Sequence, residues 1–167
     1  MSRSPSLVIV ALFIVAARLF LPDVAESGAA PPTGSRWTMP LREATVIRPF
    51  EAPAHAYAPG HRGVDISGPG REVVSPAEGV IAFAGPVAGR AVITIDHGDG
   101  LVTSLEPVET SLIPGTPVVQ GQPVGSAALG GHGGDGSIHF GVRRHGEYIN
   151  PLLLISGLAR PVLLPCC

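Results

Sequence analysis

The chain has 167 residues with 11 basic and 13 acidic side chains, and it is 45% hydrophobic but only 14% charged. About a quarter of the residues of a typical soluble protein are charged, so this chain is poor in charge. All of its basic residues are Arg, and the lack of Lys excludes a P-loop and a Schiff-base enzyme. The net charge of −2 and the absence of a basic run longer than Arg143-Arg144 argue against nucleic-acid binding.

The N-terminal segment has the features of an export signal. Arg3 supplies a positive charge, and the apolar run Leu7–Ala17 is shorter than the about 20 residues that a membrane-spanning helix needs. Gly28-Ala29-Ala30 offers small residues for cleavage. We therefore predict a signal peptide over residues 1–30. The alternative is an uncleaved anchor, in which residues 7–21 tether the protein to a membrane.

The remaining chain divides into a linker, one domain and a short tail. Residues 31–36 are rich in Pro, Gly and Ser and have little to bury, which is typical of a linker. Residues 37–158 are expected to form the domain. Residues 159–167 are expected to be a tail outside the core, where Cys166 and Cys167 are the only cysteines and cannot staple a distant loop.

Beyond Trp37, short runs rich in β-branched residues alternate with Gly and Pro. Such spacing predicts an all-β fold, a compact antiparallel sheet, sandwich or barrel-like core. The runs 91–96 and 101–105 flank a Gly-rich turn and predict a hairpin, and only 151–158 looks briefly helical. The other predicted strands are 45–48, 63–66, 73–74, 79–84, 118–119, 123–127 and 138–143.

Residues 131–136 formally match the G-x-G-x-x-G pattern of dinucleotide-binding proteins. That pattern requires a helix directly after it, because the helix N-terminus faces the pyrophosphate. Here Ser137–Val142 follows, which reads as a strand. Nucleotide binding is therefore not expected.

His61 and Asp65 stand four residues apart in His61-Arg62-Gly63-Val64-Asp65, beside a turn-rich stretch. An imidazole and a carboxylate are both suitable zinc ligands. The plainer reading of this pair alone is a hydrogen bond within a loop.

His139 offers a third ligand. In a strand over 137–143 it would lie opposite to the apolar face formed by Ile138, Phe140 and Val142, so it would point away from the core. The alternative is a histidine that simply faces solvent. Two nitrogens and one oxygen with an open fourth position would suit a catalytic zinc ion.

These residues resemble the lysostaphin/LytM-type zinc endopeptidases that cut peptidoglycan cross-bridges. The resemblance extends from Trp37 to about Leu154 and implies an antiparallel β fold with a zinc groove. It implies Zn²⁺ bound by His61, Asp65 and His139, and stem or cross-bridge peptides of peptidoglycan as substrate. The matching motifs are His61-x-x-x-Asp65, Val73-x-Ser75-Pro76-Ala77-x-Gly79, Asp96-His97-Gly98, Gly121-Gln122-Pro123-Val124-Gly125, Ile138-His139-Phe140-Gly141 and Asn150-Pro151-Leu152.

The sequence departs from the family at two helper histidines. Ser137 stands where the first histidine of H-x-H is usual, and Glu106 stands where a second helper histidine is usual. Glu106 is one candidate general base, because a carboxylate can take this role in zinc peptidases, and its alternative is a surface residue. His132 on the Gly-rich loop is the other candidate, and its alternative is a solvated side chain.

The remaining histidines are not expected in the site. His55 and His145 lie in turn-rich stretches, and His97 is expected to shape the hairpin turn. The sequence thus predicts an exported zinc metallopeptidase, located outside the cytoplasm and secreted or associated with the cell wall, with attenuated activity. The alternative is an inactive domain that keeps the zinc site and binds the wall or regulates other wall hydrolases.

Overall fold

The computed structural model describes residues 37–55, 57–128 and 136–155. Their regular structure is almost entirely β, so the all-β prediction is confirmed. None of the helical structure in these residues is long and apolar enough to cross a membrane. The predicted signal or anchor over 1–30, the linker over 31–36 and the tail over 159–167 lie outside the described residues.

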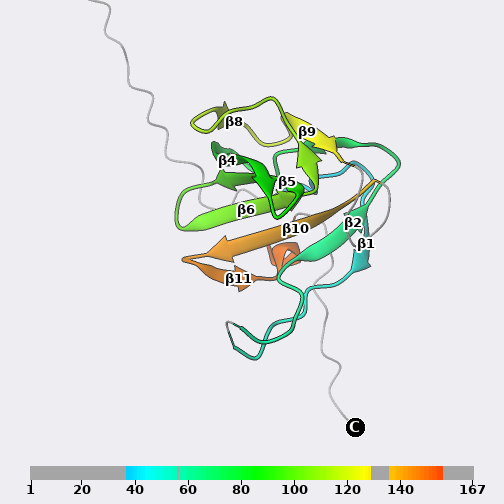
Figure 1. Ribbon diagram of the computed structural model, residues 1–167, viewed down its shortest axis with the longest axis vertical. Helices are drawn as coiled ribbons and strands as arrows, with labels where there is room; N and C mark the ends of the chain where they lie inside the picture. Colours follow the sequence, from blue (N-terminus) through cyan, green and yellow to red (C-terminus); the bar gives the residue numbers. More distant parts are fainter. Residues whose placement is uncertain (1–36, 56, 129–135, 156–167) are drawn as a thin grey trace, which may run out of the picture. The chain divides into compact units, whose positions relative to one another are not determined.

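All strand pairs in the two sheets are antiparallel (Figure 1). The larger sheet is 8-stranded, in the order β1-β2-β10-β6-β5-β4-β8 with β11 paired to β10, and the smaller is 3-stranded, in the order β3-β9-β7. The bounds are β1 Thr45–Arg48, β2 Val64–Ser67, β3 Glu72–Val74, β4 Gly79–Val87, β5 Arg90–Asp96, β6 Leu101–Glu106, β7 Val108–Glu109, β8 Pro117–Val118, β9 Pro123–Ala127, β10 Ser137–Arg144, β11 Glu147–Ile149 and the 3-10 helix η1 Pro151–Leu153.

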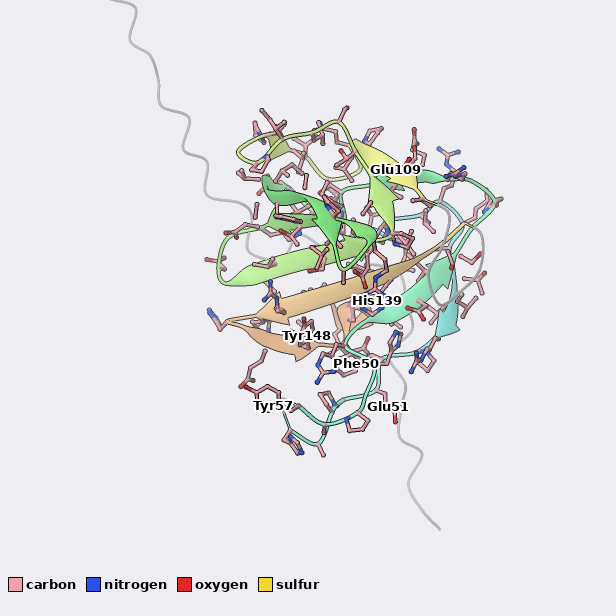
Figure 2. The ribbon with its side chains drawn as sticks, viewed as in Figure 1. Phe50, Glu51, Tyr57, Glu109, His139 and Tyr148 are labelled. Atoms are coloured by element: carbon pink, nitrogen blue, oxygen red, sulfur yellow. The ribbon has the colours of Figure 1, made fainter. Side chains whose placement is uncertain are left out.

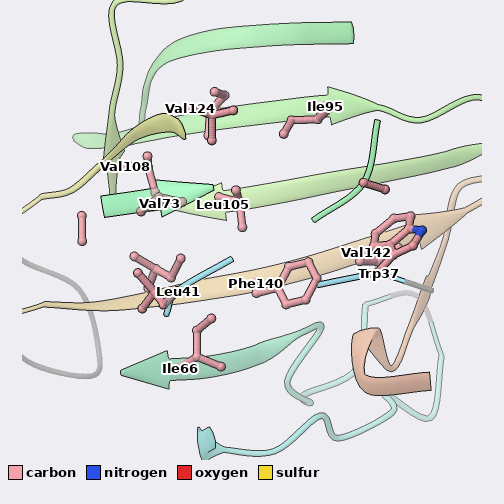
Figure 3. Close-up of a cluster of buried hydrophobic side chains, with 14 of the residues drawn as sticks. Trp37, Leu41, Ile66, Val73, Ile95, Leu105, Val108, Val124, Phe140 and Val142 are labelled. Atoms are coloured by element: carbon pink, nitrogen blue, oxygen red, sulfur yellow. The ribbon is translucent and has the colours of Figure 1, made fainter. Parts of the chain in front are cut away.

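One face of the larger sheet is covered by the apolar core (Figure 3). Alternation along β10 buries Ile138, Phe140 and Val142 on this face, as expected from the sequence. Each such side chain contributes about 1.5–3 kcal/mol by leaving water. Val73 of β3 and Val124 of β9 join the same cluster, so the smaller sheet closes the core.

The predicted hairpin is confirmed, since β5 pairs with β6 antiparallel. Strand β4 continues to Val87, three residues past the predicted end, and includes Pro86. Pro has no N–H and cannot donate a hydrogen bond to a neighbouring strand. Strand β8 pairs only with Gly79 and Val80, so Pro86 has no neighbour in β8 to which it would have to donate. Of the helical stretch predicted at 151–158, the described part forms only the short η1.

Strand register positions the polar face of the sheet. Asp65 of β2 lies opposite His139 of β10, and His139 lies opposite Glu106 of β6. Because side chains on directly opposite residues share one face of a sheet, these three point away from the core together. The larger sheet therefore presents a row of titratable groups across three neighbouring strands.

Candidate metal centre

His61, Asp65 and His139 come together as a group that could hold a metal ion, with one ligand atom from each lying within 4.8 Å of the others. The Nε2 atom of His61 lies 3.0 Å from Oδ1 of Asp65 and 3.2 Å from Nδ1 of His139. The Nδ1 atom of His139 lies 2.8 Å from the same Oδ1. The three atoms thus form a small triangle (the position of His139 is shown in Figure 2).

Hydrogen bonding fixes the tautomer of His61. Its Nδ1–H donates to the carbonyl of Pro49 at 2.7 Å, since a carbonyl can only accept. The Nε2 lone pair is then free to face Asp65 and His139, which is the arrangement usual for a metal-binding histidine. The backbone of His61 is held as well, because it exchanges two hydrogen bonds with Glu51.

Close packing of Gly63 against β10 brings His61 and Asp65 next to His139. A Cβ on Gly63 would lie 2.6 Å from Nε2 of His139 and would also collide with the carbonyl oxygen of Phe140. Only glycine lets the chain pass so near to this imidazole while His61 and Asp65 remain on either side. Gly63 is therefore part of what positions the three candidate ligands.

The donor set fits a divalent cation. The Nε2 of His61 and the Asp65 carboxylate both present lone pairs, and such acceptors gather stably around a positive charge. Ligand atoms of a tetrahedral zinc ion with bonds of about 2.0–2.1 Å lie about 3.3 Å apart, close to the separations here. His61 and Asp65 are buried, whereas the side chain of His139 is 23% exposed, which leaves the group open to solvent on one side.

Glu106, the first candidate base, lies directly across from His139 on β6. Its Oε1 lies 3.5 Å from a terminal guanidinium nitrogen of Arg90, and both side chains are partly exposed. The structure thus brings Glu106 beside the metal group but pairs it with a cation that sequence reasoning had not singled out. His132, the second candidate, lies outside the described residues.

His97 lies apart from the metal group and does more than shape the hairpin turn. Its Nδ1–H donates to the carbonyl of Glu78 at 2.6 Å, and its Nε2 accepts from the hydroxyl of Thr103 at 2.8 Å. Its ring packs against Trp37 with centroids 4.4 Å apart. Burial lowers the pKa of His97 below its usual value, although the Glu78 carbonyl and the charge of Asp96 oppose this shift.

The two other described histidines are exposed, as expected from the sequence. His55 lies in the loop before His61, and its Nδ1 accepts a weak hydrogen bond from the Tyr57 backbone. His145 lies in the β10–β11 turn with a positive φ of 51°. Neither belongs to the metal group.

Arg62, Arg143 and Tyr148 escaped the sequence analysis. The guanidinium carbons of Arg62 and Arg143 lie 5.9 Å and 6.0 Å from the ring centroid of Tyr148. Alternation along β10 could have placed Arg143 on the face of His139. Nothing in the sequence indicated that Tyr148, on the three-residue strand β11, would lie close to two arginines.

The family of the chain follows from a match over residues 59–151 to the model of peptidase family M23. The match covers the candidate ligands and more than half of the sequence. The chain belongs to peptidase family M23, whose members are zinc-dependent metallopeptidases. This confirms the family to which the sequence motifs pointed.

Individual relatives agree with this assignment. A Mycobacterium tuberculosis protein described as uncharacterized is 38% identical over 139 residues, which are 77% of this chain and 56% of the relative. The chain thus spans about half the length of the curated relatives that it matches. Csd3 of Helicobacter pylori has a TM-score of 0.61 at 26% identity, over 79% of this chain and 38% of that one.

A zinc-containing peptidase from Vibrio cholerae shares the fold, with a TM-score of 0.59 at 21% identity. The similarity covers 70% of this chain and 39% of that one. It supports the arrangement of strands that carries the metal group.

Proposed function

We propose that this chain is an exported zinc metallopeptidase that hydrolyses peptide bonds in peptidoglycan with attenuated activity. The observation that carries the proposal is the complete ligand triangle of His61, Asp65 and His139 in a member of a zinc-dependent peptidase family. Loss of any one of these side chains would leave a two-ligand site, which binds zinc far more weakly, and all three are present.

The proposed roles divide between holding the metal and moving a proton. His61, Asp65 and His139 would hold the zinc ion, and the Pro49 carbonyl keeps the His61 ring in the tautomer that this requires. A bound zinc ion would supply a Lewis acid that polarises the scissile carbonyl. The carboxylate of Glu106 would accept the proton of the attacking water, because it lies across from His139 on the same face.

The attenuated activity follows from the replacement of the two helper histidines by Ser137 and Glu106. General acid–base help contributes typically about 10²–10⁴-fold to a rate, and Ser137 cannot supply it as an imidazole does. Glu106 is also engaged with Arg90, so its carboxylate must leave or share this ion pair to take up a proton. The same ion pair favours the second candidate function, an inactive domain that binds the wall or regulates other wall hydrolases.

Digestion of purified peptidoglycan distinguishes the two functions. The zinc-loaded full chain is incubated with cell wall, and new peptide amino termini are quantified by labelling and mass spectrometry. If the chain is a peptidase, new peptide termini should appear with the wild-type protein and should be absent with the Asp65→Ala variant. Zinc-loaded protein that binds the wall and releases no new termini would support the inactive domain instead.

A further inference from the structure

The polar face of the larger sheet continues past the metal group to a pair of arginines. Arg143 lies four residues after His139 on β10, so its side chain is on the same face, about 13 Å further along the strand. Tyr148 of β11 lies directly opposite Arg143. Gly141 is the only residue between His139 and Arg143 on this face, and it contributes no side chain to block the path.

Arg62 also lies close to this tyrosine. It follows the candidate ligand His61 directly, and one terminal nitrogen donates to the Ala58 carbonyl at 3.1 Å. Its guanidinium carbon lies 5.9 Å from the Tyr148 ring centroid, and that of Arg143 lies 6.0 Å away. Cation–π contacts at such distances hold both guanidinium groups in place beside one aromatic ring.

The charge of Arg143 is not balanced within the described residues. It forms no ion pair there, and its buried Nε makes no hydrogen bond. The π face of Tyr148 attracts a cation without neutralising it. An anion that contacts the terminal nitrogens of this guanidinium would balance the charge of Arg143.

We propose that Arg62, Arg143 and Tyr148 form a subsite for a free carboxylate of the peptide substrate. A planar guanidinium group matches the geometry of a carboxylate, and contact with the tyrosine ring restricts the rotation of the Arg62 and Arg143 guanidinium groups. The separation from His139 equals about four residues of extended peptide at most, so one substrate can reach both places. This inference rests on the proposed peptidase function, because that function makes the ligand a peptide.

The test compares two peptides that differ only in charge. A fluorescently labelled stem peptide of peptidoglycan ending in a free carboxylate is compared with its carboxamide by anisotropy with the zinc-loaded full chain. We expect the carboxylate peptide to bind at least about tenfold more tightly, as charge-assisted hydrogen bonds allow, and the preference to shrink as salt is added. Equal affinity for the two peptides, or no binding of either one, would overturn the proposal.

Variants identify the residue responsible for the preference for the carboxylate peptide. Arg143→Gln should remove it while leaving affinity for the carboxamide and zinc content unchanged, and Arg143→Lys should retain part of it. Arg144→Gln is the matched control, because this exposed residue is next in the strand and projects from the other face. If Arg143→Gln keeps the full preference, zinc or another residue holds the carboxylate and the subsite assignment is wrong.

The binding result and the proposed function can fail separately. A carboxylate preference that depends on Arg143, together with no release of new termini from cell wall, supports the subsite and contradicts the peptidase. New termini without any carboxylate preference support the peptidase and contradict the subsite.

Discussion

The Nδ1 atom of His139 lies 2.8 Å from Oδ1 of Asp65, although 74 residues separate the two in sequence. The contact follows from strand register, because β10 pairs with β2 so that these residues are directly opposite. His61 completes the group from the loop before β2. The geometry of the candidate metal centre therefore depends on how closely this loop packs against β10.

Gly63→Ala should weaken metal binding without removing any ligand. The added Cβ would collide with the His139 ring and with the backbone of Phe140, which forces the loop away from β10. Competition with a chromophoric chelator measures the affinity. Gly70→Ala is the matched control, because a Cβ there meets no atom within 4 Å, and it should bind zinc as the wild type does. Equal affinities for all three proteins would contradict this account of Gly63.

Glu106→Gln should lower the rate of peptide release from cell wall by about 10²-fold or more, because it keeps the shape of the side chain and removes the base. Zinc content should not change, since Glu106 is not among the candidate ligands. Glu109→Gln makes the same substitution at an exposed position of β7, away from His139 in Figure 2, and should keep the wild-type rate.

His132→Ala tests the competing base of the same prediction. If Glu106→Gln leaves the rate unchanged and His132→Ala lowers it, the loop histidine takes the proton. If neither substitution changes a measurable rate, the assignment of the base is wrong even where the metal site stands.

Acidification should destabilise the protein through His97. Burial lowers its pKa in the folded state, so below the ordinary value of about 6.5 the unfolded chain takes up the proton first and the free energy of unfolding falls. Urea unfolding at about pH 7.5 and about pH 5.5 measures this loss. His97→Gln should lose less stability over this interval, whereas His55→Gln, at an exposed position, should behave as the wild type does. An identical loss in His97→Gln would show that other groups carry the pH dependence.

Export is tested with residues 1–35 fused to a reporter that is active only outside the cytoplasm. The apolar run 7–17 after Arg3 predicts reporter activity. Leu12→Asp interrupts this run and should abolish the activity. A silent wild-type fusion that accumulates inside the cell would contradict export.

Local sequence patterns were sufficient for the candidate ligands and for most of the strands, although not for the short strands β7 and β11. Alternation in Ile138-His139-Phe140 separates core from site. The spacing of His61 and Asp65 places His61 in the loop just before β2 and Asp65 within that strand. These patterns involve residues close together in the sequence, and the structure agrees with them.

What the sequence could not indicate depends on contacts between distant segments. The ion pair of Arg90 with Glu106 requires the register of β5 against β6, and the burial of His97 requires Trp37 to pack against it. Strand β11 is three residues long, with no apolar alternation to predict it. The arginines beside Tyr148 were missed for this reason.

Zinc content of the purified full chain tests the central claim most directly. Inductively coupled plasma mass spectrometry should find about one zinc ion per wild-type chain and far less in His61→Ala, Asp65→Ala and His139→Ala, because each leaves two of three protein ligands. His55→Ala removes an exposed histidine outside the group and should keep the wild-type content. Full zinc content in His139→Ala would contradict the metal centre described here.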